Sequence, residues 1–140
     1  MSPLYTAEAL ATGAGRNGHV ATSNGRLDLD LAIPTEMGGS VDGANPELLF
    51  AAGYAACFHS ALQTVARTKK VSVADSSVGT RVGIGSNGNG AFELSVHLEV
   101  TIPDMPTEEA QALADAAHQV CPYSNATRGN IPVTVTVSDD

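Results

Sequence analysis

The sequence predicts an α+β fold in which antiparallel strands predominate. Residues 26–33 and 92–102 alternate polar and apolar side chains, which is the period of a half-buried strand. Residues 46–70 instead combine a helix-start signal with a run of apolar and small side chains. Residues 107–121 combine such a signal with apolar side chains at helical spacing. The predicted order of elements is β-β-β-α-β-β-α-β. A length of 140 residues suits a single domain over residues 1–140, or one subunit of an intertwined oligomer.

Three strands are expected before the first helix. The pair Asn24-Gly25 is a strong two-residue hairpin turn, and it directly precedes the alternating segment 26–33. The partner strand would then cover about residues 18–23. A further strand is expected at about residues 5–12, joined to it by the glycine-rich loop 13–18.

The central helix is expected to begin at Pro46. Asn45 can cap it, proline suits the first helical position, and Glu47 complements the positive end of the helix dipole. The helix would run towards Lys69 and Lys70. Every residue from 48 to 58 is apolar or small, so this helix needs cover on all sides, and a second subunit is a natural source of it.

The second half of the chain alternates strands with one more helix. The strand at 92–102 is expected to pair with residues 77–85 through a turn at 86–90, and residues 131–137 form the last strand. The helix between them is expected to have Thr107 as its cap, Cys121 at its end and Pro122 as its stop. Its predicted apolar stripe consists of Ala110, Leu113, Ala114 and Ala117.

Composition narrows the range of partners. A formal charge of −8 repels phosphate groups, so nucleic acid and membrane surfaces are not expected partners. No apolar run approaches the roughly 20 residues that span a bilayer. The first residues do not resemble a signal peptide, so we expect a cytoplasmic protein. In a reducing compartment, two cysteines are more often catalytic, redox-active or metal-binding than a permanent disulfide.

Cys57 has two interpretations, a small buried apolar residue or a redox nucleophile. A nucleophile needs a lowered pKa and therefore a nearby cation, because the helix dipole fades long before this position. Arg16, in the glycine-rich loop, is the first candidate and Arg128 the second. Glu47 could hold an arginine in a bidentate pair, although about 15 Å of helix separates Glu47 from Cys57.

A zinc site is the main chemical alternative. Its four ligands would be Cys57, His59, His118 and Cys121. Residues two apart on a helix point in opposite directions, which makes a tetrahedral site with both Cys57 and His59 improbable. No bound metal is therefore expected.

Two long motifs resemble those of organic hydroperoxide resistance (Ohr) proteins, within the OsmC family. Residues 45–58 (NPELLFAAGYAACF) are similar to the active-site helix of that group, and residues 120–131 (VCPYSNATRGNI) to its second-cysteine signature. Residues 11–18 (ATGAGRNG) and 82–85 (VGIG) also match, so the resemblance spans nearly the whole chain.

This resemblance implies an OsmC-like fold, with antiparallel sheets wrapped around long central helices in an intertwined homodimer. It implies a peroxidase of the oxidative-stress response that reduces alkyl and fatty-acid hydroperoxides. Cys57 would be the peroxidatic and Cys121 the resolving cysteine, joined in a redox-active disulfide, while Arg16 and Glu47 activate Cys57. The implied electron donor is dihydrolipoamide or a lipoylated protein, with no bound cofactor. The alternative from another class is a non-catalytic protein that holds a lipid-like ligand in an apolar cleft.

Overall fold

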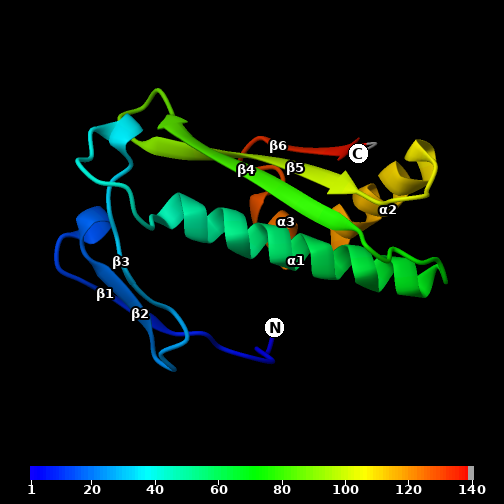
Figure 1. Cartoon of the computed structure of the whole chain (residues 1–140), viewed down its shortest axis with the longest axis horizontal. Coiled ribbons are helices and arrows are strands. Elements are labelled where there is room, and N and C mark those ends of the chain that lie inside the picture. Colours follow the sequence, from blue (N-terminus) through cyan, green and yellow to red (C-terminus); the bar gives the residue numbers. More distant parts are fainter. Residues whose placement is uncertain (139–140) are drawn as a thin grey trace. The chain divides into compact units, whose positions relative to one another are not determined.

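The structure is a computed structural model that describes residues 1–138. The chain divides into two compact units, Met1–Leu49 and Phe50–Asp140. Helix α1 (Pro46–Thr68) begins in the first unit and continues in the second. Strands and helices are mixed along the chain, which confirms the α+β class (Figure 1). A single domain over residues 1–140 stays a prediction.

The first unit contains an antiparallel sheet in the order β1-β2-β3. Its strands are β1 (Ala9–Thr12), β2 (His19–Thr22) and β3 (Asp28–Asp30), each at the predicted place but shorter than predicted. The loop between β2 and β3 is longer than the predicted two residues, because Thr22 already donates its N–H to the carbonyl of Leu27.

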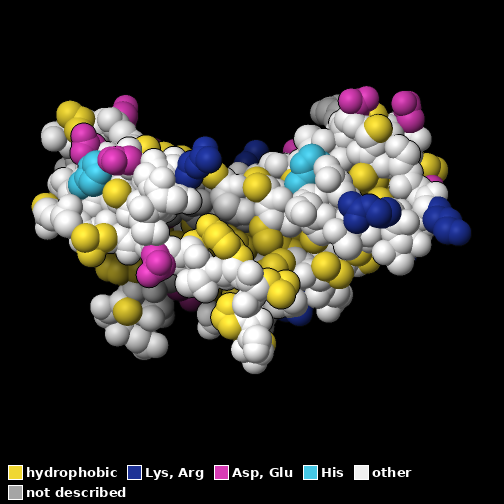
Figure 2. Space-filling model, turned by 90° about the horizontal axis from the view of Figure 1, so that it is seen from below, with side chains coloured by type: hydrophobic (Ala, Val, Ile, Leu, Met, Phe, Trp, Pro, Cys, Tyr) yellow, Lys and Arg dark blue, Asp and Glu magenta, His cyan; other side chains and the backbone are white. Residues whose placement is uncertain are grey.

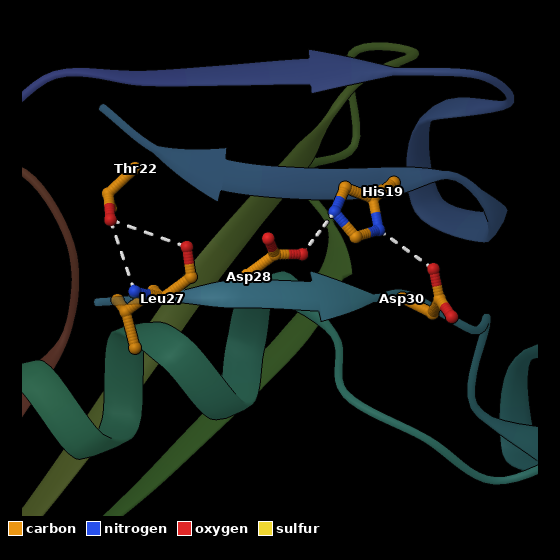
Figure 3. A network of polar contacts seen from close by, with 5 residues as sticks. All are labelled: His19, Thr22, Leu27, Asp28 and Asp30. Carbon is orange, nitrogen blue, oxygen red and sulfur yellow. Dashed lines mark hydrogen bonds and ion pairs between the residues drawn. The ribbon is translucent and has the colours of Figure 1, made fainter. Parts of the chain in front are cut away.

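Polar contacts hold β2 and β3 together (Figure 3). The His19 ring lies between two carboxylates of β3, with Nε2 2.7 Å from Asp28 and Nδ1 2.7 Å from Asp30. At the other end of the pair, the Thr22 hydroxyl accepts the N–H of Leu27 at 3.1 Å. The two carboxylates raise the pKa of His19, with the Asp30 hydrogen bond as the largest contribution.

The first unit has little buried interior of its own. Every residue of β1 is exposed, and among residues 1–49 the buried ones are Ala32 and Asn45. Two short 3-10 turns that the sequence patterns did not predict, η1 (Gly15–Asn17) and η2 (Thr35–Met37), lie on either side of the β2–β3 hairpin.

Helix α1 confirms the predicted start and end. The side-chain oxygen of Asn45 accepts the N–H of Leu48 at 2.8 Å, which caps the helix, and Pro46 occupies the first position. The helix ends at Thr68, and Lys70 follows in a left-handed conformation with φ of 58°. Its buried residues are Tyr54, Phe58, Ala61, Leu62, Val65 and Ala66.

By length and composition alone, α1 could cross a membrane. Its most apolar 18-residue window has a mean hydropathy of 1.3, so the expectation that no segment is long and apolar enough does not hold. The central helix of a globular fold has the same composition, because it packs against neighbours on several sides. On the helix surface left open in this chain, Leu48 is 56% exposed, and Ala52 and Ala56 are also exposed.

The second unit contains a sheet in the order β4-β5-β6. Strands β4 (Ser77–Ser86) and β5 (Phe92–Thr101) are antiparallel, as predicted, but β6 (Val133–Ser138) pairs parallel to β5. The connection between β5 and β6 is long and includes two helices. It can therefore return the chain to the end of the sheet from which β5 runs, which a parallel pairing requires.

The connection from β5 to β6 differs from the prediction in two ways. Helix α2 (Thr107–Val120) has Pro106, not Thr107, in its cap position. Pro122 both ends α2 and opens a further short helix, α3 (Pro122–Thr127), which had not been predicted. Cys121 is the residue between the two helices. The predicted apolar stripe of α2 is confirmed, since Ala110, Leu113, Ala114 and Ala117 are all buried.

One hydrophobic core joins the sheet and helices of this unit. Val96, Leu98 and Val100 of β5 are at most 4% exposed, whereas Phe92, at the start of the same alternation, is 71% exposed. In Figure 1, α1 runs along one face of this sheet. Figure 2, which views the molecule of Figure 1 from below, shows hydrophobic side chains at the surface.

Candidate active site

Arg16 lies in the turn η1, within the predicted glycine-rich loop. Gly13 and Gly15 take φ angles of 79° and 61°, in the left-handed region that favours glycine. A β-carbon at Gly18 would lie 2.3 Å from a backbone carbonyl oxygen, so this position also excludes a side chain. The loop therefore follows a tight path that requires glycine on both sides of Arg16.

Arg16 and Glu47 form a bidentate ion pair within the first unit. Nη1 and Nη2 of Arg16 donate to the two carboxylate oxygens of Glu47 at 2.8 and 2.7 Å. The side chain of Glu47 is 14% exposed and that of Arg16 is 35% exposed. The hydrogen bond from Arg16 lowers the pKa of Glu47, and the same bond raises the pKa of Arg16. This geometry fixes the plane of the guanidinium, which is the bidentate role that the sequence allowed for Glu47.

Cys57 and Cys121 meet within the second unit. The thiol of Cys121 donates to the sulfur of Cys57 at 3.4 Å, and both cysteines are free. Cys121 is fully buried, whereas Cys57 is partly exposed. A disulfide requires about 2.05 Å between the sulfurs, so closure needs a small further approach.

The surroundings of Cys57 in the second unit favour its neutral thiol. Burial raises the pKa of Cys57, and the neighbouring Cys121 raises it further. A hydrogen bond from the backbone N–H of Tyr123 opposes this shift. Among residues 50–138, no cation contributes, so these residues alone do not supply the lowered pKa that a nucleophile needs.

Arg128, the second candidate cation, has a structural role. Its guanidinium donates to the backbone carbonyl of His118 at 2.8 Å and to the side chain of Asn125 at 2.6 Å. It therefore joins the end of α2 to α3.

A buried hydroxyl network lies beside the two cysteines. The hydroxyl of Tyr54 is 2.8 Å from that of Ser124 and 3.0 Å from that of Thr127, and His118 Nδ1 is 2.7 Å from the Ser124 oxygen. The sequence patterns had pointed to His118, as a possible zinc ligand, but not to Tyr54, Ser124 or Thr127. The available signal was their spacing, since Tyr54 precedes Cys57 by three residues and Ser124 follows Cys121 by three.

An apolar hollow lies over the segment that directly follows Cys121. It is lined by Phe50, Pro122, Tyr123, Ala126 and Thr127 and has a volume of about 470 Å³. Three rings form a cluster at its side, with centroids 5.8 Å apart for Phe50 and Tyr123 and 5.5 Å apart for Tyr54 and Tyr123. Tyr123 contributes to both features, because its backbone faces Cys57 and its ring lines the hollow.

The two histidines considered as zinc ligands have other partners. His59 Nε2 lies 3.0 Å from the hydroxyl of Ser76, and His118 bonds Ser124. Within the part of the chain that the structure describes, no three metal-binding side chains gather.

Comparisons with known proteins show the family to which this chain belongs. Residues 38–136 match the family described as OsmC-like protein. The chain is 52% identical over 137 residues to the organic hydroperoxide resistance protein of Xanthomonas axonopodis pv. citri, covering 96% of this chain and 95% of that one. It therefore belongs to the OsmC/Ohr family, as the sequence motifs indicated.

Solved structures of similar proteins agree with this assignment. The organic hydroperoxide resistance protein from Elizabethkingia anophelis has a TM-score of 0.94 and 54% identity, with both chains covered completely. A Vibrio cholerae protein described as a putative organic hydroperoxide resistance protein, with captopril in one of its active sites, has a TM-score of 0.91 and 52% identity over 98% of this chain and 94% of that one. These similarities confirm the predicted OsmC-like fold.

Proposed function

We propose that this chain protects against organic hydroperoxides as a thiol-dependent peroxidase of the oxidative-stress response. The observation that carries the proposal is the contact between two free thiols, 3.4 Å apart, beside an apolar hollow. The relatives described as organic hydroperoxide resistance proteins support the substrate class. An apolar hollow alone would equally suit a lipid-binding protein, but pure binding needs no second thiol.

In the proposed cycle, the thiolate of Cys57 attacks the distal oxygen of ROOH and breaks the O–O bond. The alkoxide takes a proton and leaves as the alcohol, and Cys57 becomes a sulfenic acid. The sulfur of Cys121 then attacks the Cys57 sulfur. Hydroxide leaves with the Cys121 proton as water, and a disulfide forms. A lipoyl dithiol, free or on a protein, reduces this disulfide by exchange and becomes oxidised itself.

Arg16 and Glu47 complete the proposed site. Because burial and Cys121 raise the pKa of Cys57, the reaction needs a cation to stabilise the thiolate. Arg16 provides a guanidinium of defined orientation, since Glu47 holds it at two atoms. In this proposal Arg16, from the same or the partner subunit, stabilises the thiolate and the charge that develops on the leaving oxygen.

A homodimer is part of the proposal. The exposed side of α1 carries Leu48, Ala52 and Ala56, and the first unit buries few residues of its own. A second copy of the chain would cover such surfaces.

The test is peroxidase activity with tert-butyl and fatty-acid hydroperoxides, with dihydrolipoamide as the reductant. Cys57→Ser should abolish turnover. Cys121→Ser should react once and keep a trappable sulfenic acid, because the resolving thiol is missing. Wild-type turnover in Cys57→Ser would rule out the mechanism, and retention of a lipid without turnover by the wild type would favour the binding alternative.

A further inference from the structure

We propose that the hydroxyl network of Tyr54, Ser124, Thr127 and His118 positions Cys121 for disulfide closure. Tyr54 and Ser124 would be positioning residues for the second step of the cycle and would leave the first step unchanged. This inference rests on the proposed peroxidase function, because closure follows the oxidation of Cys57.

The network joins the two segments that carry the thiols. Tyr54 lies on α1 three residues before Cys57, and Ser124 lies on α3 three residues after Cys121. A hydrogen bond of 2.8 Å between their hydroxyls therefore fixes the two segments about one helical turn from each sulfur. Tyr54 and Ser124 are both fully buried, so water does not offer their hydroxyls an alternative partner.

The hydrogen bonds among the four groups can all be donated in the same direction along the network. His118 Nδ1 can donate to Ser124, Ser124 to Tyr54 and Tyr54 to Thr127. The Thr127 hydroxyl then donates to the backbone carbonyl of Ser124 at 3.3 Å. Each hydroxyl thus donates once and accepts once, and a connected network of this kind is more rigid than its separate bonds.

The rigidity matters because Cys121 lies between two helices. Its backbone N–H bonds Ala117 at the end of α2, and its carbonyl accepts the N–H of Asn125 in α3. The Tyr54–Ser124 contact holds α3 against α1 and so sets the distance of 3.4 Å between the sulfurs. A displacement of about 1 Å in a reacting group can slow a step by about 100-fold.

The same geometry predicts that the first step is unaffected. The Tyr54 hydroxyl bonds Ser124 and Thr127 and makes no hydrogen bond to either sulfur. Tyr54→Phe keeps the ring that contacts Phe50 and Tyr123, so the packing of these two lining residues of the hollow is retained. A residue that acted through stability alone would change both steps or neither, according to the fraction of folded protein.

The experiment measures the two steps separately. Reduced protein is mixed with one equivalent of tert-butyl hydroperoxide, and hydroperoxide loss is followed alongside mass spectrometry of acid-quenched samples, which resolves dithiol, sulfenic acid and disulfide. We expect closure in Tyr54→Phe and Ser124→Ala to slow by about tenfold or more, with hydroperoxide loss within about twofold of wild type. Dimedone should trap the sulfenic acid in these variants.

Two further variants make the result specific. Tyr5→Phe is the matched control, because it removes the same hydroxyl from a side chain that is 77% exposed. The double variant of Tyr54 and Ser124 should close no more slowly than the slower single variant, since both changes disrupt one network.

Closure at the wild-type rate in folded Tyr54→Phe would overturn the inference and leave the peroxidase function intact. If Tyr54→Phe does not fold, Ser124→Ala carries the same expectation and the same refutation. Failure of the peroxidase function itself would appear differently, as hydroperoxide loss that does not depend on Cys57.

Discussion

Replacing Glu47 with glutamine removes the charge that orients Arg16 and keeps the size of the side chain. Two hydrogen bonds of 2.7 and 2.8 Å join the pair. Hydrogen bonds to charged groups contribute about 1.5–3 kcal/mol each when well shielded. Arg16 is 35% exposed, so solvent screening reduces the total to about 1–2 kcal/mol. That energy corresponds to about a 5- to 30-fold change in the ratio of correctly held to free Arg16.

We therefore expect Glu47→Gln to lower kcat/KM for tert-butyl hydroperoxide, by at most about 30-fold. Arg16→Ala should lower it further, because the cation itself is lost. The assay is steady-state turnover with saturating dihydrolipoamide, together with the pH dependence of Cys57 alkylation. In both variants the midpoint of alkylation should move to higher pH, because the thiolate is less stabilised.

Two controls separate this role from the effect of Glu47 on helix stability. Glu47→Asp keeps a negative charge in the first turn of α1 but shortens the reach to Arg16, so it should resemble Glu47→Gln in activity. Glu36→Gln removes an exposed carboxylate from the first turn of η2 and should stay within about twofold of wild type. Wild-type kcat/KM in Glu47→Gln, with Arg16→Ala strongly impaired, would show that Arg16 does not depend on Glu47 for its position.

Three further predictions concern stability and pH. Phe58→Ala should lower the free energy of unfolding in urea by about 3–5 kcal/mol, because Phe58 is fully buried. The exposed Phe92 is the control, and Phe92→Ala should change this free energy by less than about 0.5 kcal/mol. Equal losses in the two variants would contradict the assigned core. Asp30 and Asp28 raise the pKa of His19. The contribution of this histidine–carboxylate interaction to stability is therefore complete below the unfolded pKa of about 6.5 and is lost as the pH rises through the folded pKa. An NMR titration should place His19 above 6.5 in wild type and lower in Asp30→Asn, and a midpoint unchanged by that substitution would disprove the pairing. Arg16 lowers the pKa of Glu47. The contribution of this pair to stability is therefore present above the unfolded pKa of about 4.3 and is lost as the pH falls through the folded pKa. Acid unfolding of wild type and Glu47→Gln measures this contribution as the difference between the two proteins.

Local features of the fold were predictable because each depends on neighbours in sequence. The cap at Asn45, the start of α1 at Pro46 and the buried stripe of α2 all follow from residues within a few positions of one another. The alternation along β5 likewise identified its buried face. It could not identify the direction of β6, because a period of two is the same in parallel and antiparallel strands.

The helix α3 and the hydroxyl network were beyond these patterns. A proline after a helix is compatible both with a stop and with the first position of another helix, and Pro122 does both. Buried hydroxyls such as those of Tyr54 and Ser124 have no periodic signature. Their partners become visible when the segments that carry them are placed together.

The family, the α+β class and the elements that carry the candidate site residues follow from the sequence alone, because motifs, caps and apolar periods are encoded locally. Which of those residues meet depends on the packing of the whole chain. It brings Cys121 to Cys57 across 64 residues and Glu47 to Arg16 across 31. Such contacts depend on how distant elements pack, and no local pattern carries that information. The same packing leaves Cys57 partly buried beside Cys121. Burial and this neighbour raise the pKa of Cys57, which is why the proposed chemistry requires a cation.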